Sequence, residues 1–535
     1  MLPVENALTI VQLFANAARN YGDRPAIEDD GRSLSYRQLD QLRGQAARAL
    51  LALNVQPGDR VAIWAPNIWE WIVAAGALQS VGAALVPLNT RMKGSEAGFI
   101  LRQSGACVLF AIGEFLGADY PRMLAAEDLP ALRHIVTLRS DDSSALSWEA
   151  FLALASDVSP QTLQTREQAL GPQDLSDLLF TSGTTGKPKG VMSSHGQTLR
   201  VVRDWSEVVG LREGDRYLIV NPFFHSFGYK AGWLAALMRG CTIVPQQIFD
   251  VQALLECVQR EQITVLPGPP TLYQSLLAHP QREAFDLTSL RIAVTGAATI
   301  PVEMIRRMRD ELGFATIVTA YGLTETCGFA TICRPGDSLE LLASTSGRAM
   351  PGVEVRCIGA NGRSQPVNVP GEIQVRGYNL MQGYFNDPQA SQEVLDADGW
   401  LHTGDIGVLD EQGYLRITDR LKDMFITGGF NVYPAEIEHC LLGYPGVAQV
   451  AVIGIPDERL GEVAMAFLLP APGVEIEQVR FLAWCREQMA NYKVPRRVQV
   501  LESMPLNAAG KVTKNVLREW ALSLLLSPSG NPLGE

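Results

Sequence analysis

The sequence has few of the features that mark specialised protein classes. Its eight cysteines are scattered over 535 residues, and no two form a C-x-x-C pair. This spacing argues against a zinc site and, in a chain of this length, against a disulfide scaffold. Basic residues are scarcer than acidic ones, 45 against 57, so the formal net charge is −12. The deficit of positive charge disfavours a general nucleic-acid-binding protein.

Signals for export and membrane insertion are also missing. Residues 1–6 lack the basic and apolar regions of a signal peptide. The most apolar long stretch, 71–88, is interrupted by Gln79, Ser80 and Pro87, whereas a membrane span needs about 20 mostly apolar residues. The sequence therefore predicts a cytoplasmic protein without an integral membrane segment.

What the chain does have is a large apolar fraction arranged in α/β order. Hydrophobic residues make up 47% of it, which excludes a disordered or fibrous protein and supplies a large core. A buried strand at 61–64, a helix at 72–78 and a strand at 84–88 predict a parallel-sheet unit. Similar strands are predicted near 218–220, 263–266 and 292–295.

The pattern changes around residue 350. Segments 353–356 and 372–375 alternate apolar and polar residues between Gly and Pro turns, which predicts antiparallel strands. A polar stretch at 419–422 precedes a last module of different composition. In that module we predict a helix from Pro434, strands at 447–455 and 463–469, and a helix at 478–489.

The strongest local motif runs from Thr181 to Gly190 and reads TSGTTGKPKG. It follows a strand-like segment, 177–180. Its glycines allow backbone N–H groups to approach a ligand, and Lys187 and Lys189 add positive charge, so the loop suits a polyphosphate. The spacing does not fit a Walker A motif. A flexible Ser/Thr/Gly surface loop is the alternative that composition leaves open.

This string resembles the phosphate-binding signature of the adenylate-forming superfamily, which includes acyl-CoA synthetases, luciferases and peptide-synthetase adenylation domains. Further matching segments follow in the family's order from Gly58 to Lys511. The resemblance implies a large N-terminal α/β domain with a distorted β-barrel subdomain, residues 1–421. A small mobile C-terminal α+β domain, 422–535, would be hinged near Lys422. It also implies that ATP, CoA and Mg²⁺ bind.

The resemblance further implies which residues hold the nucleotide and CoA. An aromatic ring can stack on adenine, a carboxylate can accept hydrogen bonds from both ribose hydroxyls, and a carboxylate oxygen can hold Mg²⁺. The implied set contains Thr181, Ser182, Gly183, Thr184, Thr185, Gly186 and Lys189 at the phosphates, Gly296, Ala297, Ala298, Tyr321 and Gly322 at adenine, Thr324 at the α-phosphate, Glu325 at Mg²⁺, Asp405 and Arg420 at ribose, Lys422 at the hinge, and Gly428, Gly429 and Phe430 at the thiol tunnel. Taken singly, these motifs are also compatible with tight packing, a helix cap, a Gly-Asp turn or a solvated linker.

Four residues are implied to take part in catalysis: His225, Thr185, Glu325 and Lys511. His225 lies in the segment NPFFHSFG, which resembles the family's gate beside the acyl pocket, although a histidine among phenylalanines is often simply packed. A neutral histidine can donate a hydrogen bond without a permanent charge. Lys511 ends the segment PLNAAGK, which resembles the catalytic-lysine loop, where a cation stabilises charge developing during adenylation. Ile426 occupies a position where some relatives carry lysine, and we assign it no role.

The substrate predicted from the sequence is a carboxylic acid without an amino group. Segment 223–230 contains no acidic residue, whereas family members that activate amino acids typically place an aspartate there. Segments 221–232, 266–277 and 294–298 resemble those of bacterial steroid-degradation CoA ligases, which activate a methylhexahydroindanedione propanoate. On this interpretation, Tyr229 and Lys230 could donate hydrogen bonds to the ring ketones.

Three alternatives stay open at this point. A general medium- or long-chain fatty acyl-CoA ligase would share every catalytic motif. An adenylation module could load a carrier protein instead of CoA, and a non-catalytic acyl or nucleotide binder could keep the fold. The predicted partners are thus small molecules, with no nucleic acid, and a homodimer is left open.

Overall fold

The first strand–helix–strand unit forms as the sequence predicts. The computed structural model describes residues 4–140, 146–181, 188–296, 300–420, 423, 425–427, 430–432, 434–457, 460–489, 491–507 and 511–526. In it, β3 (Arg60–Trp64) and β4 (Ala84–Pro87) pair in parallel, and α3 (Trp69–Ser80) lies between them in the chain. Every residue of α3 is buried, which explains why its sequence shows no polar face.

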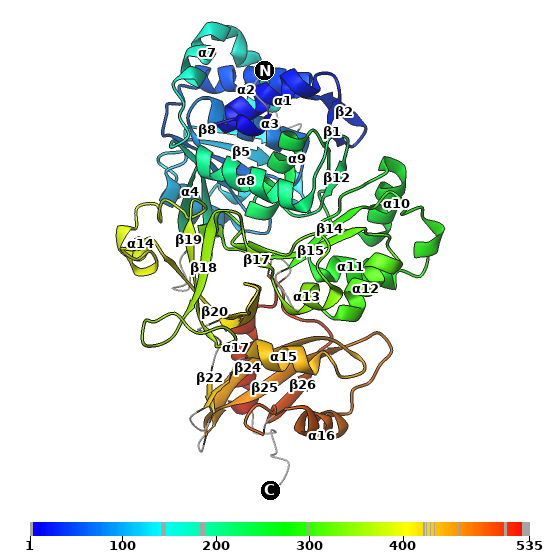
Figure 1. Ribbon diagram of the computed structural model, residues 1–535. Helices are drawn as coiled ribbons and strands as arrows, with labels where there is room; N and C mark the ends of the chain where they lie inside the picture. The colour runs from blue at the N-terminus through cyan, green and yellow to red at the C-terminus, as the bar shows by residue number, and fades with distance from the viewer. Residues whose placement is uncertain are drawn as a thin grey trace.

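These strands belong to a mainly parallel sheet of seven strands. Its order is β11 (Lys189–Ser194), β10 (Leu175–Thr181), β4, β3, β5 (Val108–Ile112), β8 (His134–Leu138) and β9 (Leu146–Ser147). Around it lie α1 (Ile10–Tyr21), α2 (Tyr36–Ala52), α4 (Gly94–Ser104), α5 (Tyr120–Met123), α6 (Trp148–Ala153), α7 (Pro160–Gln168) and the hairpin of β6 (Glu114–Phe115) with β7 (Ala118–Asp119) (Figure 1). The antiparallel hairpin of β10 and β11 forms one edge, so the phosphate-binding motif lies at the tip of an edge hairpin.

A second sheet is assembled from two four-stranded halves. One half is β12 (Arg216–Ile219), β13 (Thr242–Pro245), β1 (Pro25–Asp29) and β2 (Arg32–Ser35), and the other is β14 (Ile292–Gly296), β15 (Thr316–Tyr321), β16 (Thr331–Ile332) and β17 (Arg348–Ala349). The predicted strand at 263–266 is reduced to Val265, which bridges Tyr217 and Ile292 and so joins the halves. Pro267 has no N–H to donate, but the N–H groups of Leu266 and Gly268 on either side of it still bond to the carbonyls of Ile292 and Val294.

The helices of this region begin and end at ordinary capping signals. α8 (His195–Val209) starts at Ser194, whose side chain accepts from the Gln197 N–H, and ends at Gly210 with φ 79°. The remaining elements are the π-helix η3 (Phe227–Leu234), α9 (Ala235–Arg239), α10 (Val251–Glu261), α11 (Pro270–Ala278), α12 (Val302–Asp310), the 3₁₀ turn η5 (Thr324–Thr326) and α13 (Leu339–Ser344).

The antiparallel strands expected after residue 350 are confirmed. They form a four-stranded sheet in chain order, β18 (Val353–Ile358), β19 (Gly371–Gly377), β20 (Leu401–Leu409) and β21 (Leu415–Arg420) (Figure 1). α14 (Pro388–Val394) lies between β19 and β20 in the chain. This sheet occupies the place of the predicted barrel subdomain.

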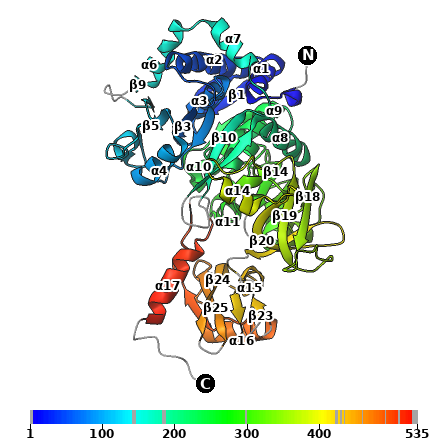
Figure 2. The same ribbon diagram turned by 90° about the vertical axis from the view of Figure 1, so that its left-hand side faces the viewer.

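The last part of the chain has hydrophobic cores of its own. The main core draws its buried residues from Val4 to Leu415, whereas two further cores run from Phe425 to Val494 and from Ala451 to Ala521. This part contains the sheet β23 (Phe430–Val432), β22 (Phe425–Thr427), β25 (Gly461–Pro470) and β24 (Val447–Asp457), with β26 (Arg497–Val500) beside β25, and the helices α15 (Pro434–Leu441), α16 (Gln478–Gln488) and α17 (Lys514–Leu526). It lies below the rest of the molecule in Figure 1, and α17 runs along one side of it in Figure 2. The boundary predicted at 421/422 falls outside the described residues.

Candidate active site

The hairpin that carries the phosphate-binding motif is closed at its base. Thr181 pairs with Lys189 and Phe180 with Gly190 across β10 and β11. The connecting residues 182–187, among them Thr185, lie outside the described residues. The structure therefore fixes where the predicted loop starts and ends.

Lys189 and the predicted metal ligand, Glu325, both contact a third residue, Tyr384. The Lys189 ammonium stands 5.1 Å from the centre of the Tyr384 ring. The Tyr384 hydroxyl donates to Oε1 of Glu325 at 2.9 Å. Burial and then the Glu325 carboxylate raise the pKa of Tyr384, so the hydroxyl keeps its proton and stays a donor. One aromatic side chain thus brings a cation and a carboxylate to the same place.

The residues predicted at adenine and ribose contact each other. Tyr321 ends β15, and its hydroxyl donates to Oδ2 of Asp405 at 2.6 Å. Asp405 is buried in β20, and its backbone pairs with that of Arg420 at the end of β21. The three positions therefore meet at one edge between two sheets, although they are far apart in the sequence.

Close backbone approaches shape this edge. A Cβ on Gly322 would come within 2.0 Å of the Gly328 carbonyl oxygen, and one on Gly296 within 2.6 Å of the Ala320 carbonyl oxygen. Any side chain at Gly322 would push apart the turn that carries Thr324 and Glu325. Ala297 and Ala298 lie outside the described residues.

His225 is solvent-exposed, yet protein atoms crowd around its ring. This crowding, and secondly the charge of Lys511, lower its pKa from 6.5 to about 4. Its Nδ1 accepts a hydrogen bond from the Phe227 N–H at 3.2 Å. A neutral ring that accepts at Nδ1 carries its proton on Nε2. The structure thus makes His225 a neutral donor near neutral pH, as its expected place beside anions requires.

Lys511 belongs to the C-terminal part of the chain, yet its charge acts on His225 in the N-terminal part. Its own backbone holds it in place: the Lys511 N–H donates to Oδ1 of Asn507 at 2.9 Å, and the Asn507 N–H donates to the Lys511 carbonyl at 2.8 Å. The side chain is exposed. The predicted catalytic lysine therefore lies near enough to the predicted acyl gate for its charge to lower the pKa of His225.

The hinge and thiol-tunnel residues are described only in part. Lys422, Gly428 and Gly429 lie outside the described residues. The backbone of Phe430 pairs with that of Thr427 in the short hairpin of β22 and β23. For these positions the roles stay predictions.

Tyr229 and Lys230 do not point into an acyl site, so their expected role as ketone donors is wrong. Both are fully buried. The Lys230 ammonium lies 3.2 Å from Oδ1 of Asp177, and the Tyr229 hydroxyl accepts from Nε2 of Gln79 at 2.8 Å. A buried charge needs a partner of opposite sign, and Lys230 takes an internal one.

Sequence reasoning missed two residues at the site. Tyr384 follows the end of β19 without a motif to single it out. Asn67 precedes α3 and is buried, with its side chain donating to the carbonyls of Ile219 and Asn221 and accepting from the Phe223 N–H at 2.8 Å. It thereby ties the acyl-gate segment to the first sheet. No local pattern marks either residue, because their partners are distant in sequence.

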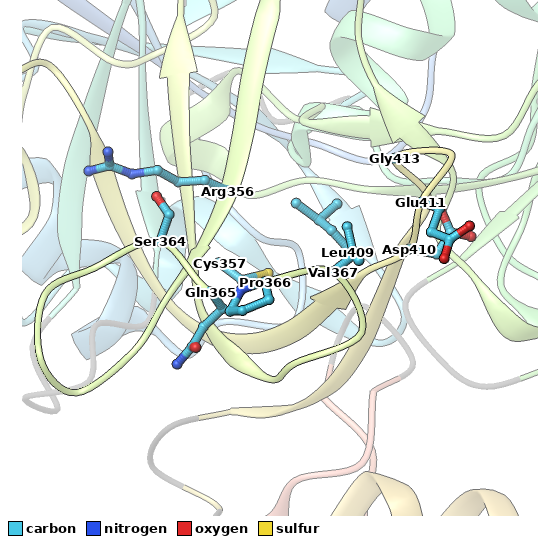
Figure 3. A pocket seen from close by; sticks show the side chains of 10 residues that line it. All are labelled: Arg356, Cys357, Ser364, Gln365, Pro366, Val367, Leu409, Asp410, Glu411 and Gly413. Carbon is cyan, nitrogen blue, oxygen red and sulfur yellow. The ribbon is translucent and has the colours of Figure 1, made fainter.

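One recess of the described surface lies away from the predicted site. It has a volume of about 240 Å³ and lies between the strand ends of the antiparallel sheet (Figure 3). Arg356, Gln365, Val367, Asp410 and Glu411 are among its lining residues, and it shares none with the predicted site.

The described residues place limits on metals and membranes. They contain no group of three or more His, Cys, Asp or Glu that could hold a metal ion by itself. A single oriented carboxylate such as Glu325 still fits Mg²⁺, which commonly binds through one or two carboxylates together with substrate phosphates. No helix within the described part of the chain is long and apolar enough to cross a membrane.

Comparison with known proteins agrees with this geometry. A family model described as AMP-binding enzyme matches residues 14–385, and one described as AMP-binding enzyme C-terminal domain matches residues 436–511. A 7a-methyl-1,5-dioxo-octahydroindenyl-propanoyl:CoA ligase from Mycobacterium tuberculosis is 49% identical over 96% of this chain and 99% of that protein. The ligase of the same name from Rhodococcus jostii is 47% identical over 96% of this chain and 99% of its own.

A solved structure extends the comparison to three dimensions. The structure of the anthranilate CoA ligase AuaEII in complex with anthranoyl-AMP superposes on this chain with a TM-score of 0.87 and 27% sequence identity. The match covers 98% of this chain and 100% of that one. Both family models describe AMP-binding enzymes, and both relatives are named CoA ligases. The chain therefore belongs to the AMP-binding enzymes and, within them, to the ATP-dependent acyl-CoA ligases.

Proposed function

We propose that this enzyme joins CoA to the propanoate side chain of a steroid-derived indanedione. The observation that carries the proposal is the identity of 49% and 47% to two ligases named for such a propanoate, each matched over 99% of its length. The reaction has two steps. The carboxylate attacks the α-phosphate of ATP, giving acyl-adenylate and pyrophosphate, and the CoA thiol then attacks the acyl carbon and releases AMP.

In the first step the chain acts by positioning and electrostatics, without a side-chain nucleophile. We assign Lys189 and Lys511 to the negative charge that develops as the oxygen–phosphorus bond forms and pyrophosphate leaves. The neutral Nε2–H of His225 would donate to a carboxylate or phosphate oxygen beside Lys511. Bound Mg²⁺ would neutralise phosphate charge, and Glu325, oriented by Tyr384, would hold it.

The nucleoside would lie against Tyr321 and Asp405. The Tyr321 hydroxyl fixes one oxygen of the Asp405 carboxylate at 2.6 Å. The Asp405 carboxylate would accept hydrogen bonds from the ribose hydroxyls. A hydrogen bond to a charged acceptor contributes about 1.5–3 kcal/mol, which is more than a bond between neutral groups contributes.

We expect Asp405→Asn to raise the KM for ATP about 10- to 100-fold, because a neutral amide accepts more weakly than a carboxylate. The substitution keeps the side-chain volume and an oxygen for the Tyr321 hydroxyl. Initial rates at varied ATP measure the effect. Asp398→Asn, exposed in the turn before β20, is the matched control. An unchanged KM for ATP in Asp405→Asn would exclude the ribose role.

An acid without an amino group fits the electrostatics of the acyl side. The gate segment contains no acid, and Asp177, which lies behind it, is neutralised by Lys230 and fully buried. An ammonium on the substrate would find no carboxylate partner among these residues. This supports a plain carboxylic acid over an amino acid.

A panel of acids assayed for pyrophosphate release tests the substrate. We expect the indanedione propanoate to give a kcat/KM at least about 100-fold above linear fatty acids, since a pocket shaped for rings loses several contacts with a chain. Medium- or long-chain fatty acids turning over faster would replace the proposal with a general fatty acyl-CoA ligase. Turnover with a carrier protein but not with CoA would indicate a loading module, and no AMP with any acid a non-catalytic binder.

Three further assignments complete the proposal. The part from residue 422 onward would swing about a hinge near Lys422 between the two steps, if Lys511 serves adenylation alone. The reaction would take place in the cytoplasm, where ATP and CoA are available, which cell fractionation tests. The homodimer stays a prediction that light scattering of the purified chain can check.

A further inference from the structure

A buried ion pair lies directly behind the predicted site and is used by none of the steps above. Lys230 and Asp177 are both completely shielded from solvent, with the ammonium 3.2 Å from Oδ1 of the carboxylate. The ammonium also donates to Oγ of Ser193 at 3.0 Å. Asp177 and Ser193 face each other across β10 and β11. One ammonium therefore contacts both strands of the phosphate-loop hairpin.

The position of these contacts along the hairpin links them to the loop. Asp177 precedes Thr181 by four residues, and Ser193 follows Lys189 by four, so the ammonium grips both strands at equal distance from the loop. At the rise of an extended strand this distance is about 13 Å. If the Lys230 ammonium moved relative to the hairpin, the two paired strands would transmit the displacement to Thr181 and Lys189 at the ends of the loop.

Lys230 itself is carried by the acyl side of the site. It lies in the π-helix η3, five residues after His225. A π-helical turn places side chains differently from an α-helix and occurs often at functional sites. Here it turns Lys230 inward, away from the gate and toward the hairpin.

Further segments join the same network. The Cys327 thiol donates to Oγ of Ser193 at 3.5 Å, and Cys327 follows Glu325 by two residues. Ser176 donates to Oδ2 of Asp177 at 2.7 Å, and Gln79 of α3 donates to the Ser176 carbonyl at 3.2 Å. The network therefore joins the β10–β11 hairpin, the π-helix η3, the turn that carries Glu325 and the core helix α3.

Stability alone gives little reason for such a pair. Removing two charges from water costs about as much as their attraction returns, and apolar residues of similar volume often serve equally well or better. Burial by itself would lower the pKa of Lys230, but the carboxylate of Asp177 raises it, so Lys230 keeps its positive charge. What an ion pair adds over an apolar contact is a fixed direction and distance.

We propose that Lys230 is a positioning residue, which through Asp177 and Ser193 holds the phosphate-loop hairpin in register with the π-helix η3, which begins two residues after His225. It touches no substrate. Its effect would be to keep the attacked phosphate and the attacking carboxylate in line during adenylation, and it has this role only if the chain forms an acyl-adenylate as proposed.

The double variant Lys230→Met/Asp177→Leu tests this without leaving a charge unpaired. We expect it to unfold near the wild-type temperature, while kcat for pyrophosphate release falls about 100-fold, the loss that a displacement of about 1 Å can cause. The KM for ATP and for the acid should change far less, and thioester formation from supplied acyl-adenylate should stay at the wild-type rate. The matched control is Arg216→Met/Glu261→Leu, a pair 2.5 Å apart that joins β12 to α10 away from the site.

A folded double variant with wild-type kcat for pyrophosphate release would overturn the proposal. So would an equal loss in both half-reactions, since that indicates general damage. If the double variant does not fold, Ser193→Ala decides: a selective fall in adenylation kcat supports the proposal, and no fall overturns it. Failure of the proposed function would show in the wild-type chain itself, as no pyrophosphate release with any acid.

Discussion

Lys511→Ala should lose adenylation activity by about 10²- to 10³-fold while still converting supplied acyl-adenylate and CoA to the thioester. A positioned charge that stabilises a transition state is worth about this much when it is removed. The structure supports the first half of the prediction, because the Lys511 charge already acts on His225 at the acyl gate. The second half follows if the C-terminal part rotates before the thiol attacks.

Two separate assays measure the effect. Pyrophosphate release reports the first step, and AMP release from synthetic acyl-adenylate with CoA reports the second. Lys493→Ala, another lysine of the C-terminal part beside Tyr492, controls for loss of a positive charge in that part. Equal losses in both steps would contradict the domain rotation, and no loss in the first step would remove Lys511 from the catalytic residues.

Lys230→Met alone should lower the free energy of unfolding by about 3–5 kcal/mol. The substitution leaves the Asp177 carboxylate fully buried without its cation, and breaking a buried pair from one side typically costs this much. Adding Asp177→Leu should recover most of the loss. Urea unfolding followed by tryptophan fluorescence measures both changes.

An exposed pair supplies the comparison. Arg37 and Asp23 lie 2.7 Å apart, with side chains 56% and 77% exposed, so Arg37→Met should cost no more than about 1 kcal/mol. The contrast between the two arginine- or lysine-to-methionine changes isolates burial as the cause. A cost for Lys230→Met as small as that for Arg37→Met would mean that water reaches the Asp177 carboxylate.

Local sequence patterns were sufficient for the first strand–helix–strand unit. The runs at 61–64 and 84–88 became β3 and β4, and the apolar stretch between them became α3, because strands and helices of a parallel sheet are buried along their whole length. In the second sheet, the strand predicted at 263–266 is reduced to a bridge at Val265. Pro267 lacks a donor, although the Leu266 and Gly268 N–H groups still bond to the carbonyls of Ile292 and Val294.

The sequence by itself also supplied the predicted chemical groups of the site. Lys189, Glu325, Asp405 and Lys511 were predicted from motifs, since short strings with fixed spacing carry the backbone geometry and the charge that nucleotide chemistry needs. The structure then brought Tyr321 to Asp405 and the charge of Lys511 to His225.

Only the tertiary structure decided which polar side chains near the predicted gate are buried in the scaffold. Tyr229 and Lys230 are adjacent to the gate in sequence, but the π-helix turns them into the core. There Lys230 pairs with Asp177, and the Tyr229 hydroxyl accepts a hydrogen bond from Gln79. No sequence motif marks Tyr384, yet its hydroxyl donates a hydrogen bond to the Glu325 carboxylate and so orients it. The physical reason is that a buried polar group must find its partner wherever the fold provides one, and in this protein those partners come from distant strands and helices.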